Sequence, residues 1–213
     1  MRPTITAFKT SPDRGRGLAR DMAVRWALEE VGQPYTLRPV HLSRAEHKQD
    51  EVVGLNPMGK LPVLVDDGVV VTEVAAIGLY LADRYAAGCL APALNDPRRG
   101  PYLRWALFGP SVIEPGSMAK ASGWTYREGA AGWGNPEAMV AAIGAALRPG
   151  PFVLGDDFSM VDVILGSTLR YMVSFKMLDA DEALQAYLAR IDARPAYQRA
   201  QAVNAEAAVA MGL

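Results

Sequence analysis

Cysteine and histidine are scarce in this chain. Its 213 residues include one cysteine, Cys89, and two histidines. A single cysteine excludes an internal disulfide and a multi-cysteine metal site, and it is typical of a protein that folds in a reducing compartment. We therefore expect no bound metal.

A strong charge of one sign and long apolar runs are also absent. The formal net charge is -1 at pH 7, which gives no reason to expect a nucleic acid or an anionic membrane as a partner. No apolar run approaches the ~20 residues that a membrane-spanning helix needs. The first residues lack the apolar core of a signal peptide. We expect a soluble cytoplasmic protein.

The first part of the chain alternates between strand-like and helix-like segments. Strands are predicted near residues 5–8, 35–40, 61–65 and 69–72, and helices at residues 18–31 and 73–85. The order β-α-β and then β-β-α is that of the thioredoxin-like fold, in which one strand pair is parallel and the last is antiparallel. We predict an α/β domain of this fold over residues 1–86.

The rest of the chain is rich in alanine and leucine with helical spacing, and only residues 152–154 are strand-like. Two proline-containing turns between residues 88 and 101 indicate the boundary. Ser159 and Asp162 have the spacing of a capping box at the start of a helix over residues 160–171, which we expect to be buried and structural. We predict an all-helical domain over residues 93–213.

Residues 56–65 combine a turn-rich entry with a strand. Pro62 stands near the start of this strand, and a proline donates no hydrogen bond to a sheet. The main chain at the strand start is therefore predicted to be free to bind something else. Glu73 begins the helix that follows the next strand. Together these features predict a peptide-binding edge.

Residues 56–64, followed closely by residues 72–77, resemble the N-terminal domain of the glutathione S-transferase family. Residues 152–155 and 159–162 resemble the helical C-terminal domain of the same family. The resemblance implies a homodimeric cytosolic protein of detoxification that binds glutathione as a cosubstrate in the first domain. It also implies a second, apolar substrate between the domains.

The resemblance implies a set of contacts to glutathione. The main chain of Leu61 would pair with the cysteinyl part, and a cis peptide bond before Pro62 would turn that main chain outward. Glu73 matches an acidic residue of the family. Val74 stands where the family has a serine, but main-chain amides at this helix start could still bind the γ-glutamyl carboxylate.

Residues 45–48 resemble a segment of theta-like and bacterial family members, in which His47 and Lys48 would hold the glycine carboxylate of glutathione. These positions also have structural interpretations. His47 and Lys48 can be solvated loop residues, Glu73 can favour the helix dipole, and Pro62 can be an edge-strand proline.

The loop at residues 9–17 is where the family carries the group that activates the glutathione thiol. A hydroxyl group that donates to the sulfur lowers the pKa of the thiol, because it favours the charged form. This loop has no tyrosine and no cysteine. We predict Ser11 as the activating residue and Thr10 as the second candidate. Arg14 or Arg16 could supply positive charge instead, and Ser11 could be a turn residue before proline.

The second substrate is expected to contact aromatic side chains of the helical domain, with Tyr102, Phe108 and Trp124 as candidates. Trp105 also fits, but aromatic residues at helical spacing are often core residues. The predicted function is transfer of glutathione to a small hydrophobic electrophile, or a related peroxidase, isomerase or dehalogenase reaction. The alternative is a non-catalytic ligand carrier or protein-interaction module of the same fold.

Overall fold

The computed structural model describes residues 2–213. The chain forms two compact units: residues up to Tyr85 together with Arg194–Leu213, and Ala86–Ala193. The sequence predicts that all helices after residue 93 share one domain. In the structure the last helix, α9 (Pro195–Ala210), instead packs in the first unit against α1 (Arg20–Glu30).

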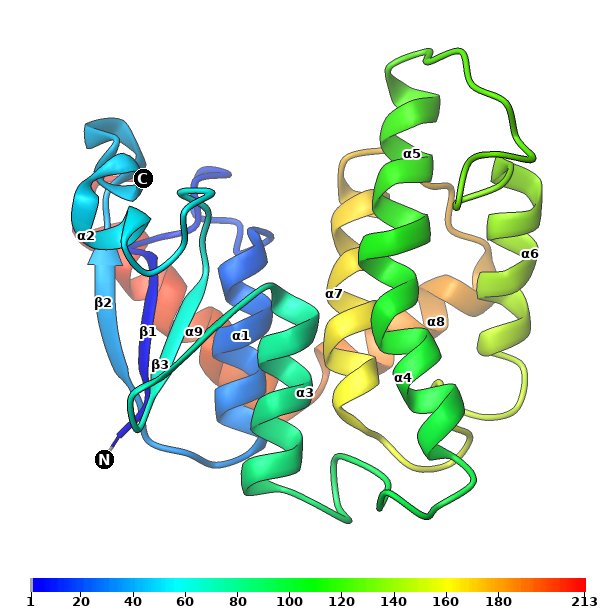
Figure 1. Ribbon diagram of the computed structural model, residues 1–213, viewed down its shortest axis with the longest axis horizontal. Helices are drawn as coiled ribbons and strands as arrows, with labels where there is room; N and C mark the ends of the chain where they lie inside the picture. Colours follow the sequence, from blue (N-terminus) through cyan, green and yellow to red (C-terminus); the bar gives the residue numbers. More distant parts are fainter. Residues whose placement is uncertain (1) are drawn as a thin grey trace. The chain divides into compact units, whose positions relative to one another are not determined.

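The first unit contains a four-stranded mixed sheet with the order β2-β1-β3-β4 (Figure 1). Its strands are β1 (Thr4–Phe8), β2 (Thr36–Val40), β3 (Val63–Asp66) and β4 (Val69–Thr72). β1 pairs with β2 in parallel, and the pairs β1–β3 and β3–β4 are antiparallel. The predicted thioredoxin-like fold is confirmed.

Helix α1 is the core helix of this unit. It contacts both α3 (Val74–Tyr85) and α9, and it buries Val24, Trp26 and Leu28. The Trp26 ring meets the Tyr197 ring of α9 edge-on, with centroids 5.1 Å apart. This aromatic contact stabilises the packing of α9 on α1 more than an exposed ion pair would.

Three short elements connect β2 to β3. They are η1 (Leu42–Arg44), η2 (Glu46–Lys48) and α2 (Asp50–Val53). The polar composition of residues 41–54 predicts a loop with a short helix, which agrees with this arrangement.

The second unit is helical. Its elements are α4 (Arg99–Phe108), η3 (Gly109–Ile113), α5 (Glu114–Ala121), α6 (Pro136–Ala146), α7 (Met160–Ser174) and α8 (Glu182–Asp192). α4, η3 and α5 follow one another as one long rod (Figure 1). The π-helical turn η3 contains Pro110, which lacks the amide that a regular helix needs.

Helix α7 lies at the centre of the second unit and begins with the predicted capping box of Ser159 and Asp162. Most of its residues are buried, as its apolar composition predicts. The strand-like residues 152–154 do not form a strand. Phe152 makes only an isolated bridge to Gly155, since no second strand runs beside it in this helical unit.

Two features are absent from residues 2–213. No helix among them has both the length and the apolar character needed to cross a membrane. In the same described range, no group of three His, Cys, Asp or Glu side chains is placed to hold a metal ion.

Candidate active site

The predicted binding residues of the first unit meet at one edge of its sheet. Thr6 of β1 pairs with Val63 of β3, and Val63 also pairs with Thr72 of β4. Because both pairs are antiparallel, the end of β1, the start of β3 and the end of β4 lie at the same edge. β2 ends there too, since Phe8 pairs with Val40 in parallel. The segments that leave this edge are the loop at residues 9–17, η1, η2 and the start of α3.

The turn before β3 is held by its own side chain. Asn56 is buried, its amide group donates to the carbonyl of Lys60 at 3.0 Å, and its side-chain oxygen accepts from the Met58 amide at 3.1 Å. The Leu61–Pro62 peptide bond that follows is cis, which confirms the prediction for this bond.

The main chain of Leu61 is open for binding. The sheet pairing of β3 begins at Val63, and within residues 2–213 no hydrogen bond involves the amide or carbonyl of Leu61. Leu61 is partly exposed, whereas Pro62 is buried. Unpaired main chain at a sheet edge can add a short extended peptide through hydrogen bonds.

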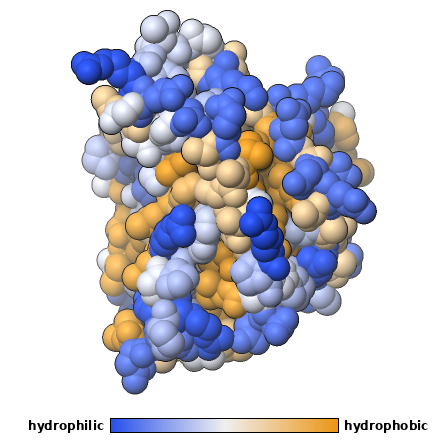
Figure 2. Space-filling view, turned by 90° about the vertical axis from the view of Figure 1, so that its right-hand side faces the viewer, coloured by the Kyte–Doolittle hydropathy of each residue, from blue (hydrophilic) through white to orange (hydrophobic). Residues whose placement is uncertain are grey.

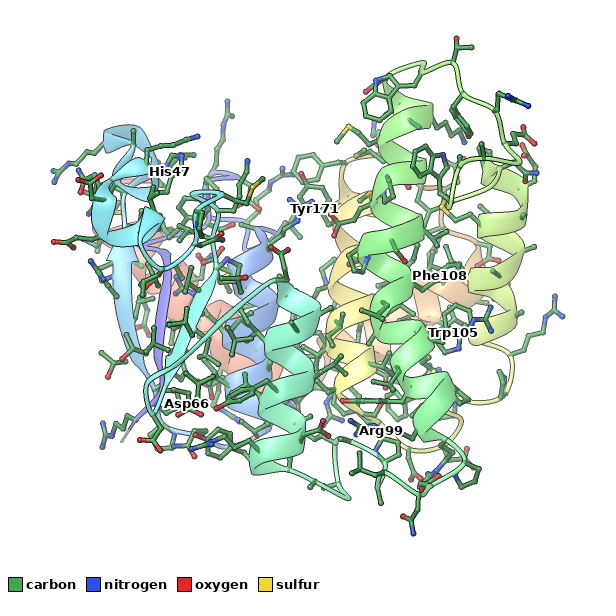
Figure 3. The ribbon with its side chains drawn as sticks, viewed as in Figure 1. His47, Asp66, Arg99, Trp105, Phe108 and Tyr171 are labelled. Atoms are coloured by element: carbon green, nitrogen blue, oxygen red, sulfur yellow. The ribbon has the colours of Figure 1, made fainter. Side chains whose placement is uncertain are left out.

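The predicted pair His47 and Lys48 lies beside this turn. A Cβ atom at Gly59 would stand 3.1 Å from the His47 carbonyl and 3.7 Å from the Lys48 side chain. Gly59 also has φ +57°, so glycine suits both the conformation and the close approach. The buried Nδ1 atom of His47 has no hydrogen-bond partner among the described residues. Figure 3 shows His47 and Asp66 at opposite ends of this unit.

Glu73 stands between β4 and α3 with φ +69°, an unusual conformation for a residue with a side chain. Its side chain is exposed and its carbonyl accepts from the Ile77 amide at 2.9 Å. Val74 follows as the first residue of α3 and is half-buried. The start of this helix therefore presents main-chain amides beside Glu73 at the same edge as Pro62.

The loop at residues 9–17 holds both hydroxyl candidates inside the unit. Ser11 is fully buried, and its hydroxyl oxygen accepts a hydrogen bond from the Ala19 amide at 3.1 Å. Within residues 2–213 no acceptor binds the Ser11 hydroxyl proton. Thr10 is 7% exposed, and its hydroxyl group donates to the side-chain oxygen of Asn204 at 3.2 Å. The geometry therefore leaves a donor on Ser11 and uses the donor of Thr10.

The two arginines of the loop differ in their contacts. Arg16 donates to the main-chain carbonyl of Asp13 at 3.1 Å. The Asp13 carboxylate in turn accepts from the Leu18 amide at 2.8 Å. Arg14 is exposed and has φ +64°.

Asn204 of α9 is a site residue that the sequence did not suggest. It is 1% exposed, and it binds Thr10, the Ser11 amide at 2.8 Å and the Gly15 carbonyl at 2.7 Å. One pattern could have indicated it. The buried positions of α9 are spaced by four residues, and three of them are alanine while the fourth is this asparagine. A polar side chain on an otherwise apolar buried face needs partners.

A buried ion pair lies under the same loop. Arg25 donates to the carbonyl of Phe8, the last residue of β1, and its guanidinium lies 3.3 Å from the Asp21 carboxylate. Burial raises the pKa of Asp21 from 3.8 to about 6, against the opposing effect of the Arg25 charge. The pair ties α1 to the end of β1, from which the loop begins.

The predicted second-substrate residues occupy different environments in the second unit. Tyr102 is fully buried, with the Arg99 guanidinium over its ring. Phe108 is partly exposed and packs edge-on against the buried Trp105, as Figure 3 shows along α4. Trp124 is 56% exposed. Phe108 and Trp124 therefore offer aromatic surface, whereas Tyr102 lies in the core.

A pocket of ≈ 320 Å³ lies elsewhere in this unit, between α6 and the start of α8. Ile143, Leu147, Leu178 and Leu184 line it. Figure 2 shows the face of the second unit that carries α6, where apolar side chains form a patch bordered by polar ones. None of the predicted substrate residues lines this pocket.

Models of known protein families match residues in both units. Residues 22–84 match the glutathione S-transferase N-terminal domain, and residues 129–202 match the glutathione S-transferase C-terminal domain. This chain belongs to the glutathione S-transferase family. The match to the N-terminal domain begins after the loop at residues 9–17.

Relatives and solved structures of the family are similar along most of the chain. Glutathione S-transferase GstA of Escherichia coli O157:H7 is 27% identical over 186 residues, covering 85% of this chain and 92% of that one. A ternary complex of BphK, a bacterial GST, superposes with a TM-score of 0.74 at 26% identity and covers 95% of this chain and 99% of that one. URE2P6 of Phanerochaete chrysosporium, in complex with oxidized glutathione, gives 0.76 at 20% identity and covers 97% of each chain, which shows the fold.

Proposed function

We propose that this protein is a glutathione transferase that activates the glutathione thiol for attack on a small hydrophobic electrophile. The observation that carries the proposal is the unpaired main chain of Leu61 at the sheet edge from which the loop at residues 9–17, η2 and α3 also leave. A tripeptide that adds to this edge would pair its cysteinyl part with Leu61. URE2P6, which shares the fold, binds oxidized glutathione.

The two carboxylates of glutathione would bind to two different segments at the sheet edge. His47 and Lys48 offer positive charge or donors for the glycine carboxylate. The main-chain amides at the start of α3 would take the γ-glutamyl carboxylate, and Glu73 would accept from its amino group. Val74 supplies no hydroxyl group, so that contact would depend on the main chain alone.

Thiol activation is assigned to Ser11, with Thr10 as the second candidate. A free cysteine thiol has a pKa of about 8.5, so little thiolate is present near neutral pH. The unused proton of Ser11 can donate to a thiolate and favour it, whereas the Thr10 proton is already bound by Asn204.

For the electrophile, Phe108 and Trp124 would provide apolar surface, and Tyr102 would support α4 from the core. Related glutathione-dependent peroxidase, isomerase or dehalogenase reactions would use the same activated thiol. A homodimer in the cytoplasm is proposed from the family resemblance, and light scattering of the purified protein tests the dimer.

The test combines binding and turnover. We expect retention on immobilised glutathione and conjugation of glutathione to a chloro-nitrobenzene. S11A is expected to lower kcat/KM by more than about tenfold, because it removes a donor to the thiolate. T36A, which removes an exposed hydroxyl group of β2, is the matched control and should keep the wild-type rate. An unchanged rate in S11A together with a loss in T10V would move the role to Thr10.

A carrier without catalysis is the second candidate. The loss of a hydroxyl group at Val74 and the burial of Ser11 favour it. Retention on glutathione without any turnover would support the carrier. Absence of both retention and turnover would exclude both functions.

A further inference from the structure

We propose that Asn204 of α9 is a positioning residue for thiol activation, which holds the loop at residues 9–17 so that the Ser11 hydroxyl group stays at the start of α1. This inference rests on the proposed transferase activity. It assigns a role in the reaction to a residue that lies 193 positions from Ser11 in the sequence.

The loop needs an external support. Arg14, Gly15 and Gly17 all have positive φ values, of 64°, 77° and 73°. Such a segment has many accessible conformations when it is not held, and ordering it costs conformational entropy. The loop has internal hydrogen bonds, such as Gly15 amide to Ser11 carbonyl at 3.0 Å, but no helix or strand within it.

Asn204 provides that support with both ends of its amide group. Its oxygen accepts from the Thr10 hydroxyl group and the Ser11 amide, and its nitrogen donates to the Gly15 carbonyl. A buried side chain that satisfies three groups of one loop fixes that loop strongly, because each unpaired group would carry a desolvation cost. Only an amide of this length combines the acceptor and the donor here.

The contact passes directly to Ser11. The Ser11 amide is held by Asn204, while the Ser11 hydroxyl oxygen is held by the Ala19 amide. The two bonds together fix the main chain and the side-chain rotamer of Ser11. A donor fixed in this way loses no entropy when it meets the sulfur, which is the advantage of preorganisation.

Other residues dock α9 independently of Asn204. Tyr197 packs on Trp26, and Arg194 forms a two-point ion pair with Glu30 at 2.6 and 2.8 Å. Removal of the Asn204 side chain should therefore loosen the loop while α9 stays in place.

The experiment is a double-mutant cycle of N204A and S11A in the full-length protein. The readouts are kcat/KM for the chloro-nitrobenzene and the pKa of the bound glutathione thiol, followed by thiolate absorbance. We expect N204A to lower kcat/KM by about tenfold and to raise the thiol pKa, because the donor is no longer held in place. In the S11A background, N204A should lower the rate by less than about twofold more, since both changes remove one interaction.

The control on the same helix is R199A. Arg199 forms an exposed ion pair with Glu29 at 2.8 Å, and its hydrogen bonds go to Glu29 and not to residues 9–17. R199A should keep the wild-type rate and thiol pKa. Because N204A leaves three buried groups of the loop without a partner, it can destabilise the whole protein. N204D provides a second variant that keeps an acceptor for Thr10 and Ser11 and loses the donor to Gly15. Its cycle with S11A should show the same lack of additivity.

Three results would overturn the inference: an unchanged rate and thiol pKa in N204A, an equal loss in R199A, or a full multiplicative loss when N204A or N204D is added to S11A. If the wild-type protein binds glutathione and conjugates it to the chloro-nitrobenzene, any of these three results overturns only this inference and leaves the proposed function in place. A wild-type protein without binding or turnover overturns the proposed function, and this inference with it.

Discussion

Two buried hydrogen-bond networks, one in each unit, are built in opposite ways. In the second unit, the Asp162 carboxylate accepts from the Ser159 amide at 2.9 Å and the Val153 amide at 2.9 Å, which are three and nine residues away. In the first unit, Asn204 binds Thr10 and Ser11 across more than 190 residues. The network at Asp162 forms as its helix starts, whereas the network at Asn204 requires the completed fold.

The difference has a functional meaning. The local network at Asp162 secures a central helix that has no role in the proposed chemistry. The remote network at Asn204 instead fixes a loop that carries a proposed catalytic group. A network between distant segments closes only when both are docked, so it couples the order of the loop to the position of α9.

Removal of the local network should have the largest effect on stability. D162A leaves the Ser159 amide, the Val153 amide and the Tyr187 hydroxyl group without their acceptor. We expect the free energy of unfolding to fall by about 3 kcal/mol. S159A removes one capping side chain and should cost about 1 kcal/mol. Denaturant unfolding measures both, and equal losses would contradict the assignment of most of the energy to Asp162.

The same carboxylate predicts a pH dependence. Burial raises the pKa of Asp162 in the folded protein from 3.8 to about 6. Between these values the folded state holds a proton that the unfolded state has released. The contribution of this proton to stability is therefore present below about pH 4 and is lost as the pH rises through 6. The stability of the wild type relative to D162N should fall over this window, and a flat difference would contradict the raised pKa.

The next largest loss of stability is expected where α9 lies close to the loop at residues 9–17. A Cβ atom at Gly15, which has φ +77°, would stand 2.7 Å from the Cβ atom of Ala208. Gly32 has φ +65° with no atom within 4 Å of an added Cβ. G32A should cost about 1 kcal/mol from conformation alone, and G15A about 2 kcal/mol because it adds a clash. If thermal unfolding shows equal losses, Ala208 does not press on the loop in solution.

The smallest effect is expected at the surface of α9. R199A removes an exposed ion pair with Glu29 and should cost less than about 1 kcal/mol, because solvent screens such pairs. Its effect should shrink further in high salt. A loss comparable with that of G15A would show that surface charge, rather than the buried contacts, docks α9 in the first unit.

The local features of the site were predictable from the sequence. A proline at a strand start, a turn made by Asn56 and Gly59, and a helix beginning after Glu73 each depend on neighbouring residues only. The capping box of Ser159 and Asp162 is of the same kind, since its partners are three residues apart. The family resemblance then assigned glutathione contacts to His47, Lys48 and Leu61, and these residues do gather at one sheet edge.

Tertiary structure decided the rest. Tyr102, Phe108 and Trp124 were predicted to contact the second substrate that the family resemblance implies, but burial depends on all the helices around them and leaves Tyr102 in the core. The sequence also predicted that α9 belongs with the later helices, because the alanine-rich face of α9 does not indicate which helix it packs against. The chain by itself determined which segments turn, pair and coil, because these choices depend on local conformational preferences. The completed packing decided that a helix near the C-terminus meets the loop near the N-terminus, because a buried asparagine shows its partners only when distant segments have closed around it.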